Sequence, residues 1–261
     1  MEKVGDERRK APSAMALGTT VANALAAMLS GHEAAAESFH HERTHMNSEQ
    51  TLSKKQQAIA PIAAATAAGD LPQLNAALNQ GLDAGLSVSD VKEILVQLYA
   101  YAGFPRSLNA LGELMKVMDS RRQRGIQDAP GRGPGPIPTG PALLAAGTAN
   151  QTQLSGGPVK GALFDFAPAI GEYLKTHLFG DIFARDNLDW QSRELATVAA
   201  LAALSGVEPQ LQAHIRISMN VGLTAAQLGS LADALAEGGR ADAALRARDA
   251  LDKQLAASAK R

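Results

Sequence analysis

The sequence predicts an all-α protein made of two copies of one helical unit. Hydrophobic residues form 46% of the chain and aromatic residues only 4%, so the core is expected to be rich in alanine and leucine. These two residues lead the scale of helix propensity, whereas β-branched and aromatic residues favour strands. Apolar residues also recur at helical spacing, as Val91, Ile94, Leu95 and Leu98 do. The third observation is an internal repeat with an offset of 137 residues.

The repeat aligns two passages without a gap. Segment 69–74, Gly-Asp-Leu-Pro-Gln-Leu, lies over segment 206–211, Gly-Val-Glu-Pro-Gln-Leu, and the same offset lays Gly-Leu-Ser at 85–87 over Gly-Leu-Thr at 222–224. Each copy is therefore expected to form a helix, a tight turn, a second helix, a glycine cap and a third helix. Two related copies in one chain usually pack about a pseudo-twofold axis, as a homodimer would.

Composition excludes several classes of function. The chain has 25 Lys and Arg against 26 Asp and Glu, a net charge of -1, so no nucleic-acid partner or anionic membrane partner is expected. It has no cysteine. Disulfides, thiolate metal sites and every thiol-based redox mechanism are thereby excluded.

Residues 1–50 differ from the rest of the chain. Basic residues at positions 3, 8, 9 and 10 precede a run of small residues, in the outline of a secretory signal. Polar residues dilute the apolar run, so both a signal-like segment and a disordered N-terminus stay open, and the compartment is either cytoplasmic or periplasmic. The run is also too polar for a membrane span. His40, His41 and His45 beside Glu42 are expected to be a solvated tail, with metal binding as the minor alternative.

The remaining chain divides into three parts. Residues 51–120 are expected to hold the first repeat, including a helix that starts at Ser87, where Asp90 completes a weak capping box. Residues 121–159 contain six of the twelve prolines and are expected to form a linker or extended arm. Residues 160–255 are expected to hold a lead-in helix, whose aromatic residues serve as packing anchors, and the second repeat.

His214 and Glu194 are the candidate catalytic pair. A short turn at Gly206 joins their helices and can bring a carboxylate against an imidazole, the usual arrangement for a general acid or base. The alternative is a core histidine satisfied by a structural carboxylate. The first copy has Ala77 and Gln57 at these two positions.

The two copies differ in complementary ways. The first copy carries Tyr-Ala-Tyr-Ala-Gly-Phe-Pro-Arg at 99–106, where the second has Ala-Glu-Gly-Gly-Arg at 236–240. Such complementary loss is expected of a duplicated dimer that keeps one composite site while the other decays.

Together these residues resemble the carboxymuconolactone decarboxylase family. The resemblance rests on Arg-Glu-Leu at 193–195, on Leu211 and His214, on Gly-Leu-Thr at 222–224, and on the Tyr99 to Arg106 run, and it extends from Leu52 to about Leu251 apart from the linker. It implies a duplicated helical repeat of the alkylhydroperoxidase D-like kind. Family members assemble as rings, often hexamers, so a doubled chain is expected to form a homo-oligomer, a trimer. The related thiol branch has cysteines where this chain has Val207 and Gln210, which excludes peroxidase chemistry here.

The resemblance implies cofactor-independent, metal-independent decarboxylation of a small carboxylated lactone such as 4-carboxymuconolactone. His214 would transfer the proton and Glu194 would set its tautomer. Arg193 and Arg106 would bind the substrate carboxylate, with Arg216 the weakest candidate. Tyr99 and Tyr101 could donate to the developing oxyanion, although Tyr101 also fits a core position. The alternative is a non-catalytic structural or accessory member of the fold, or an oxidoreductase accessory without thiol peroxidase activity.

Overall fold

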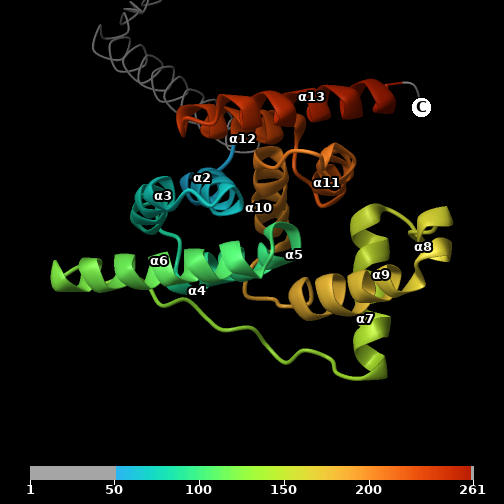
Figure 1. Ribbon diagram of the computed structural model, residues 1–261, viewed down its shortest axis with the longest axis horizontal. Coiled ribbons are helices and arrows are strands. Elements are labelled where there is room, and N and C mark those ends of the chain that lie inside the picture. The colour runs from blue at the N-terminus through green and yellow to red at the C-terminus, as the bar shows by residue number, and fades with distance from the viewer. Residues whose placement is uncertain (1–50, 260–261) are drawn as a thin grey trace, which may run out of the picture. The chain divides into compact units, whose positions relative to one another are not determined.

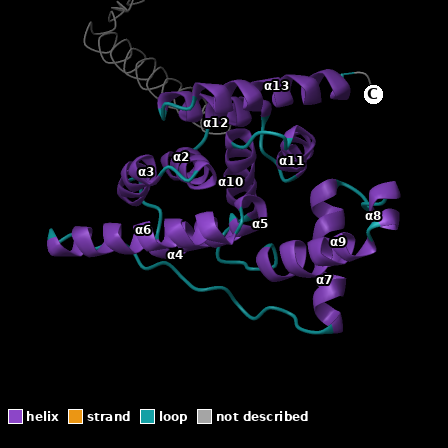
Figure 2. Cartoon of the chain, in the orientation of Figure 1, coloured by secondary structure: helices purple, strands orange, loops and turns teal. Residues whose placement is uncertain are grey.

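The computed structural model describes residues 51–259, and this part of the chain is helical, with no strand (Figures 1 and 2). The predicted all-α class is confirmed. The expected signal-like segment and the histidine tract lie outside the described residues. No helix within 51–259 combines the length and the apolar character that crossing a membrane requires.

The predicted duplication is visible in the order of the helices. The first copy contains α2 (Lys54–Ala68), α3 (Leu71–Asp83), α4 (Val88–Gln97), α5 (Tyr99–Ala102) and α6 (Phe104–Gln123). The second contains α10 (Trp190–Ala203), α11 (Glu208–Asn220), α12 (Ala225–Glu237) and α13 (Ala241–Ser258). Helices α3 and α11 begin at 71 and 208, α4 and α12 at 88 and 225, and α6 and α13 at 104 and 241, so the offset of 137 holds for these three pairs.

Local chemistry explains why the two copies begin and end their helices alike. Gly69 and Gly206 have φ of 74° and 79°, a left-handed conformation that other residues adopt only with strain. Ser87 and Thr224 each cap the following helix with both arms of a capping box. The sequence expectation at these positions is confirmed.

The two equivalent helices α2 and α10 pack against each other and form the centre of the core (Figure 1). Both helices are rich in buried alanine, including Ala63, Ala64, Ala199 and Ala200, all fully buried. Such small side chains let helices approach closely. Helix α12 also packs on α2, and α4 on α10, so each copy contributes to the surroundings of the other.

The segment between the copies is more ordered than a simple linker. Residues 126–139 are extended, and Arg132 forms an ion pair with Asp186, 3.1 Å from Nη1 to Oδ2. Residues 141–155 instead form helix α7 (Pro141–Ser155), contrary to the expectation of an extended arm. Pro141 stands in the first helical turn, where the missing N–H has no intrahelical partner to lose.

The lead-in region consists of α8 (Ala162–Phe166), α9 (Pro168–Tyr173) and a nine-residue π-helix, η1 (Leu174–Ile182). Helix α7 crosses η1 at Gly147. A Cβ atom at position 147 would lie 1.7 Å from the Lys175 carbonyl oxygen, so the two backbones touch directly. Only glycine permits that approach.

Candidate functional site

The centre of the candidate site is a hydrogen-bonded pair on two consecutive helices of the second copy. His214 Nδ1 on α11 lies 2.8 Å from Glu194 Oε2 on α10. Glu194 is fully buried and His214 is 8% exposed. The structure therefore brings together the two residues that the sequence singled out.

The geometry sets the tautomer of the imidazole. An ionised Glu194 only accepts hydrogen bonds, so Nδ1 must carry the hydrogen and Nε2 becomes the basic nitrogen. Among residues 51–259, Nε2 has no hydrogen-bond partner. It is thus the ring atom able to exchange a proton with a ligand.

Tyr101 brings the first copy into the site. It lies on α5, and its ring meets the His214 ring edge to face, with 5.5 Å between centroids and 84° between planes. Burial raises the pKa of the Tyr101 phenol, and the charge of Glu194 raises it further, while Thr197 and Arg193 oppose this shift only in part. The phenol therefore stays neutral and keeps its proton for donation.

Further polar atoms near the pair are buried without partners. The second carboxylate oxygen of Glu194 and the hydroxyl of Ser218 make no hydrogen bond to any residue of the described chain. Ser218 follows His214 by one helical turn on α11. Buried polar groups are normally satisfied, so these two atoms are unpaired hydrogen-bonding groups beside the pair. The sequence signal for Ser218 was only its spacing from His214.

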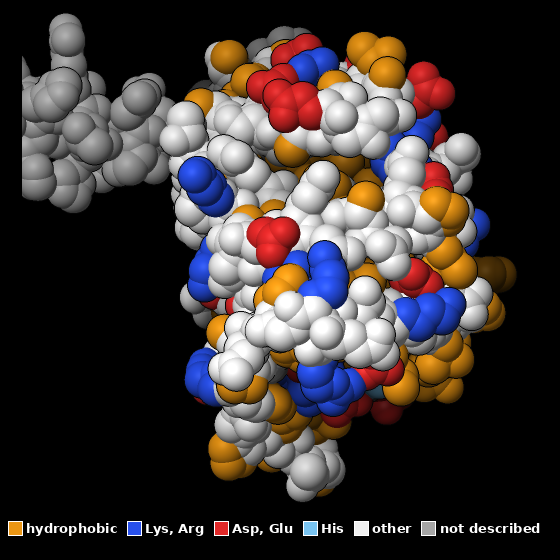
Figure 3. Space-filling view, turned by 90° about the vertical axis from the view of Figure 1, so that its left-hand side faces the viewer, with side chains coloured by type: hydrophobic (Ala, Val, Ile, Leu, Met, Phe, Trp, Pro, Cys, Tyr) orange, Lys and Arg blue, Asp and Glu red, His pale blue; other side chains and the backbone are white. Residues whose placement is uncertain are grey.

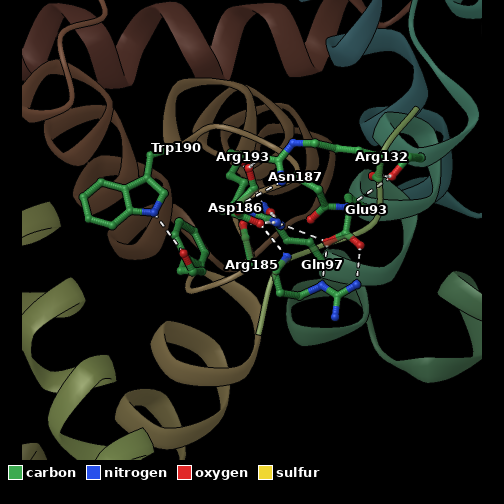
Figure 4. A network of polar contacts seen from close by, with 11 residues as sticks. Glu93, Gln97, Arg132, Arg185, Asp186, Asn187, Trp190 and Arg193 are labelled. Carbon is green, nitrogen blue, oxygen red and sulfur yellow. Dashed lines mark hydrogen bonds and ion pairs between the residues drawn. The ribbon is translucent and has the colours of Figure 1, made fainter. Parts of the chain in front are cut away.

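Arg193 is held in an interior network rather than presented to a ligand (Figure 4). Its Nη2 lies 3.1 Å from Glu93 Oε2 and its Nη1 lies 3.1 Å from Gln97 Oε1. Arg185 binds the same Glu93 carboxylate with two hydrogen bonds of 2.6 and 2.8 Å. Because Arg193 immediately precedes Glu194, this network fixes the rotation of α10 that aims Glu194 at His214.

Burial alone would raise the pKa of Glu93. Hydrogen bonds from Arg185, Asn187 and Arg193 outweigh that effect and lower the pKa to about 2. The carboxylate therefore stays ionised, and it joins α4 of the first copy to α10 of the second.

The other predicted substrate-binding residues lie in different surroundings. Arg106 donates to the carbonyl oxygen of Ala67 at the end of α2. The ring of Tyr99 stacks on Phe104 at 4.4 Å and tilts against His177 at 5.5 Å. No hydrogen bond, ion pair or ring contact within residues 51–259 joins Arg106 or Tyr99 to His214, and Arg216 is exposed to solvent.

Two cavities in the described part of the chain do not include the pair. One of about 660 Å³ lies between α7, α8 and α9, with Gln151, Phe164 and Lys175 in its wall, and another of the same volume borders Trp190 and Asn220. Neither is lined by Glu194 or His214. Within 51–259, no three His, Asp or Glu side chains gather as metal ligands.

Comparisons with known proteins reproduce the duplication. The sequence model described as the carboxymuconolactone decarboxylase family matches residues 33–115 and 168–253. A solved structure from Burkholderia xenovorans LB400, provisionally assigned as a gamma-carboxymuconolactone decarboxylase subunit, is 20% identical in sequence. That match covers 82% of this chain and 82% of the other, with a TM-score of 0.46. No curated protein matches the chain.

Proposed function

The chain belongs to the carboxymuconolactone decarboxylase family, and we propose that it decarboxylates a small carboxylated lactone without a cofactor. The observation that carries the proposal is the buried hydrogen bond between Glu194 and His214, with Tyr101 of the other copy against the imidazole. A carboxylate that orients an imidazole is suited to moving one proton.

In the proposed reaction the bond between the ring carbon and the carboxylate breaks, and carbon dioxide leaves. The electron pair moves into the conjugated lactone carbonyl, so the substrate itself accepts the charge. Nε2 of His214 then takes up a proton from solvent and gives it to carbon. One proton is consumed for each carbon dioxide released.

Each neighbouring group has a distinct task in this proposal. Glu194 stabilises the imidazolium through Nδ1. The neutral phenol of Tyr101 and the unpartnered hydroxyl of Ser218 are donors for the developing oxyanion. Arg193 is a positioning residue, because its guanidinium is bound to Glu93 and Gln97. Among residues 51–259, Arg106 and Tyr99 make no hydrogen bond, ion pair or ring contact with His214 or Glu194, so no step is assigned to them.

The test follows the ultraviolet absorbance of 4-carboxymuconolactone mixed with the full-length chain, together with carbon dioxide release. The wild type is expected to consume substrate and release equimolar carbon dioxide, and His214→Ala to lower kcat at least about hundredfold. His177→Ala is the matched control, because His177 also pairs with a carboxylate, Asp181 at 2.7 Å, but on the surface. Its rate is expected to equal that of the wild type.

One observation favours the second candidate function, a non-catalytic member of the fold. The pair is almost sealed, with His214 only 8% exposed and Glu194 fully buried. Turnover that survives His214→Ala would overturn the assigned role of His214. A folded wild-type chain that leaves this lactone and other small cyclic acids unchanged would overturn the enzyme proposal and support the structural alternative.

A further inference from the structure

The internal repeat gives every residue of the candidate site a counterpart on the other side of the core. With the offset of 137, His214 corresponds to Ala77 and Tyr101 corresponds to Gly238. Glu194 corresponds to Gln57, whose amide donates to the Leu52 carbonyl at 2.8 Å. The counterpart therefore lacks both rings and the carboxylate.

A cavity of about 210 Å³ lies at this counterpart position. Its wall includes Ala77 and Gly238, together with Gln73, Gln80 and Arg240. By the offset of 137, Gln73, Gln80 and Arg240 correspond to Gln210 and Ile217 on α11, the helix of His214, and to Gly103 just after α5, the helix of Tyr101. The space that an imidazole and a phenol fill on one side of the core is thus open on the other.

The counterpart also carries charges that the candidate site lacks. Arg240 stands at the position equivalent to Gly103, and Glu237 at the position equivalent to Ala100. Asp70, which binds Arg240, is equivalent to Val207. The absence of the imidazole and the phenol alone would leave an apolar cavity. The charged side chains of Glu237 and Arg240 in its wall make it able to bind a charged ligand.

Arg240 is the principal recognition group. Its Nη2 lies 3.1 Å from Asp70 Oδ2, and its side chain is 16% exposed. Asp70 is its one side-chain partner in the described part of the chain, which leaves other guanidinium N–H groups for a ligand. Glu237 is exposed at the same cavity and has no ion-pair partner among residues 51–259.

Apolar residues line the same cavity as the charged side chains of Arg240 and Glu237. Pro61, Ala77 and Leu235 line the cavity beside the amides of Gln73 and Gln80. Figure 3 views the molecule from the side on which α3 lies in Figure 1, and acidic and basic side chains are interspersed over that face. A ligand here meets both signs of charge within a small volume.

We propose that this cavity binds a small zwitterion, of the chemical class of a free aliphatic α-amino acid. Arg240 would take the carboxylate, Glu237 would take the ammonium group, and the alkyl group would lie on Pro61 and Leu235. A simple carboxylate would bind Arg240 but leave Glu237 without a partner. A simple amine would leave the free N–H groups of Arg240 unused.

The experiment is calorimetric titration of the full-length chain with three matched probes. L-Alanine carries both charges, whereas propionate lacks the ammonium group and ethylamine lacks the carboxylate. We expect saturable binding of L-alanine, one per chain, and at least tenfold weaker binding of the other two. Arg240→Gln is expected to weaken L-alanine binding at least tenfold.

Gly238→Tyr tests the location, because it restores the ring that the other half of the molecule has. The backbone permits it, since φ at Gly238 is -73°, although the new Cβ would lie 3.2 Å from the Ala234 carbonyl oxygen. Arg248→Gln is the control, because Arg248 forms an exposed ion pair with Asp233 away from the cavity. Binding is expected to be lost in Gly238→Tyr and kept in Arg248→Gln.

The proposal does not rest on the decarboxylase assignment, and binding is expected to persist in His214→Ala. Equal or tighter binding of propionate or ethylamine would overturn the zwitterion class. Unchanged L-alanine binding in Arg240→Gln would overturn the assigned cavity, and an absence of L-alanine binding to the wild type would overturn the whole inference.

Discussion

The rings of His214 and Tyr101 meet edge to face, with 5.5 Å between their centroids. The two residues belong to different copies of the repeat and lie 113 positions apart in the sequence. The catalytic candidate is therefore a composite of both copies. Its carboxylate and imidazole come from α10 and α11, and its phenol comes from α5.

Glu194→Gln removes the charge that, in the proposed reaction, stabilises the imidazolium, and it keeps the side-chain volume. We expect kcat on the lactone to fall by about 10²–10⁴. Circular dichroism and urea unfolding are expected to show an intact fold. Asp181→Asn, which alters the exposed pair of His177, is the control and is expected to keep the wild-type rate. An equal loss of kcat in Glu194→Gln and Asp181→Asn would contradict the catalytic role proposed for Glu194.

Tyr101 is expected to remain un-ionised in the folded protein at alkaline pH, because burial raises the pKa of its phenol. A folded-state pKa above the unfolded value means that this group contributes stability below about pH 10 and loses it at higher pH. Titration by tyrosinate absorbance is expected to give the same folded-state signal for wild type and Tyr101→Phe. A smaller signal in Tyr101→Phe would show that the phenol ionises in the native state.

Glu93 is expected to make stability sensitive to acid. Its folded-state pKa is about 2, below the ordinary value of a glutamate, so its contribution is complete above about pH 5 and declines between there and pH 2. The full contribution is about 3 kcal/mol of unfolding free energy. Urea unfolding at a series of pH values is expected to show this decline in the wild type and a shallower one in Glu93→Gln. Parallel curves of stability against pH for the wild type and Glu93→Gln would contradict the lowered pKa of Glu93.

Gly147→Ala is expected to disrupt the crossing of α7 and η1, because the new methyl group would occupy the position of the Lys175 carbonyl. The expected loss is about 1–3 kcal/mol, seen as a lower midpoint in urea. Gly112→Ala on α6 is the matched control, since nothing lies within 4 Å of its Cβ position. That change is expected to be neutral or stabilising by up to about 1 kcal/mol.

The chain is expected to assemble as a trimer with six repeats, as the family resemblance implies for a doubled subunit. Light scattering on the full-length protein at several concentrations gives the mass directly, to be compared with the 27.1 kDa of one chain. A mass near three chains agrees with the prediction. A single chain at every concentration would contradict it.

Much of the fold could be predicted because its determinants are local. The capping boxes at Ser87 and Thr224 and the left-handed glycines at 69 and 206 act within a few residues, so sequence spacing reveals them. The juxtaposition of Glu194 and His214 was also accessible, because only a short turn separates their helices.

Non-local packing accounts for what the sequence did not reveal. The partners of Arg193 are Glu93 and Gln97, about a hundred positions away, so nothing near Arg193 indicated that its charge is used inside the protein. Helix α7 was hidden by the density of prolines before it, although Pro141 itself suits a first helical turn. The counterpart cavity arises because Ala77 and Gly238 stand where the other copy has His214 and Tyr101. The spacing of residues along the sequence does not show that this difference leaves a cavity.

The pairing of α2 with α10 also bears on how the two halves of the molecule change over generations. In a homodimer one coding sequence specifies both halves, so a mutation that benefits one half is imposed on the other. Here positions 77 and 214 lie in one chain and are encoded separately, so each can mutate alone while every molecule contains one of each. Selection can therefore retain a histidine in one half and an alanine in the other, and a division of labour can arise without a second gene.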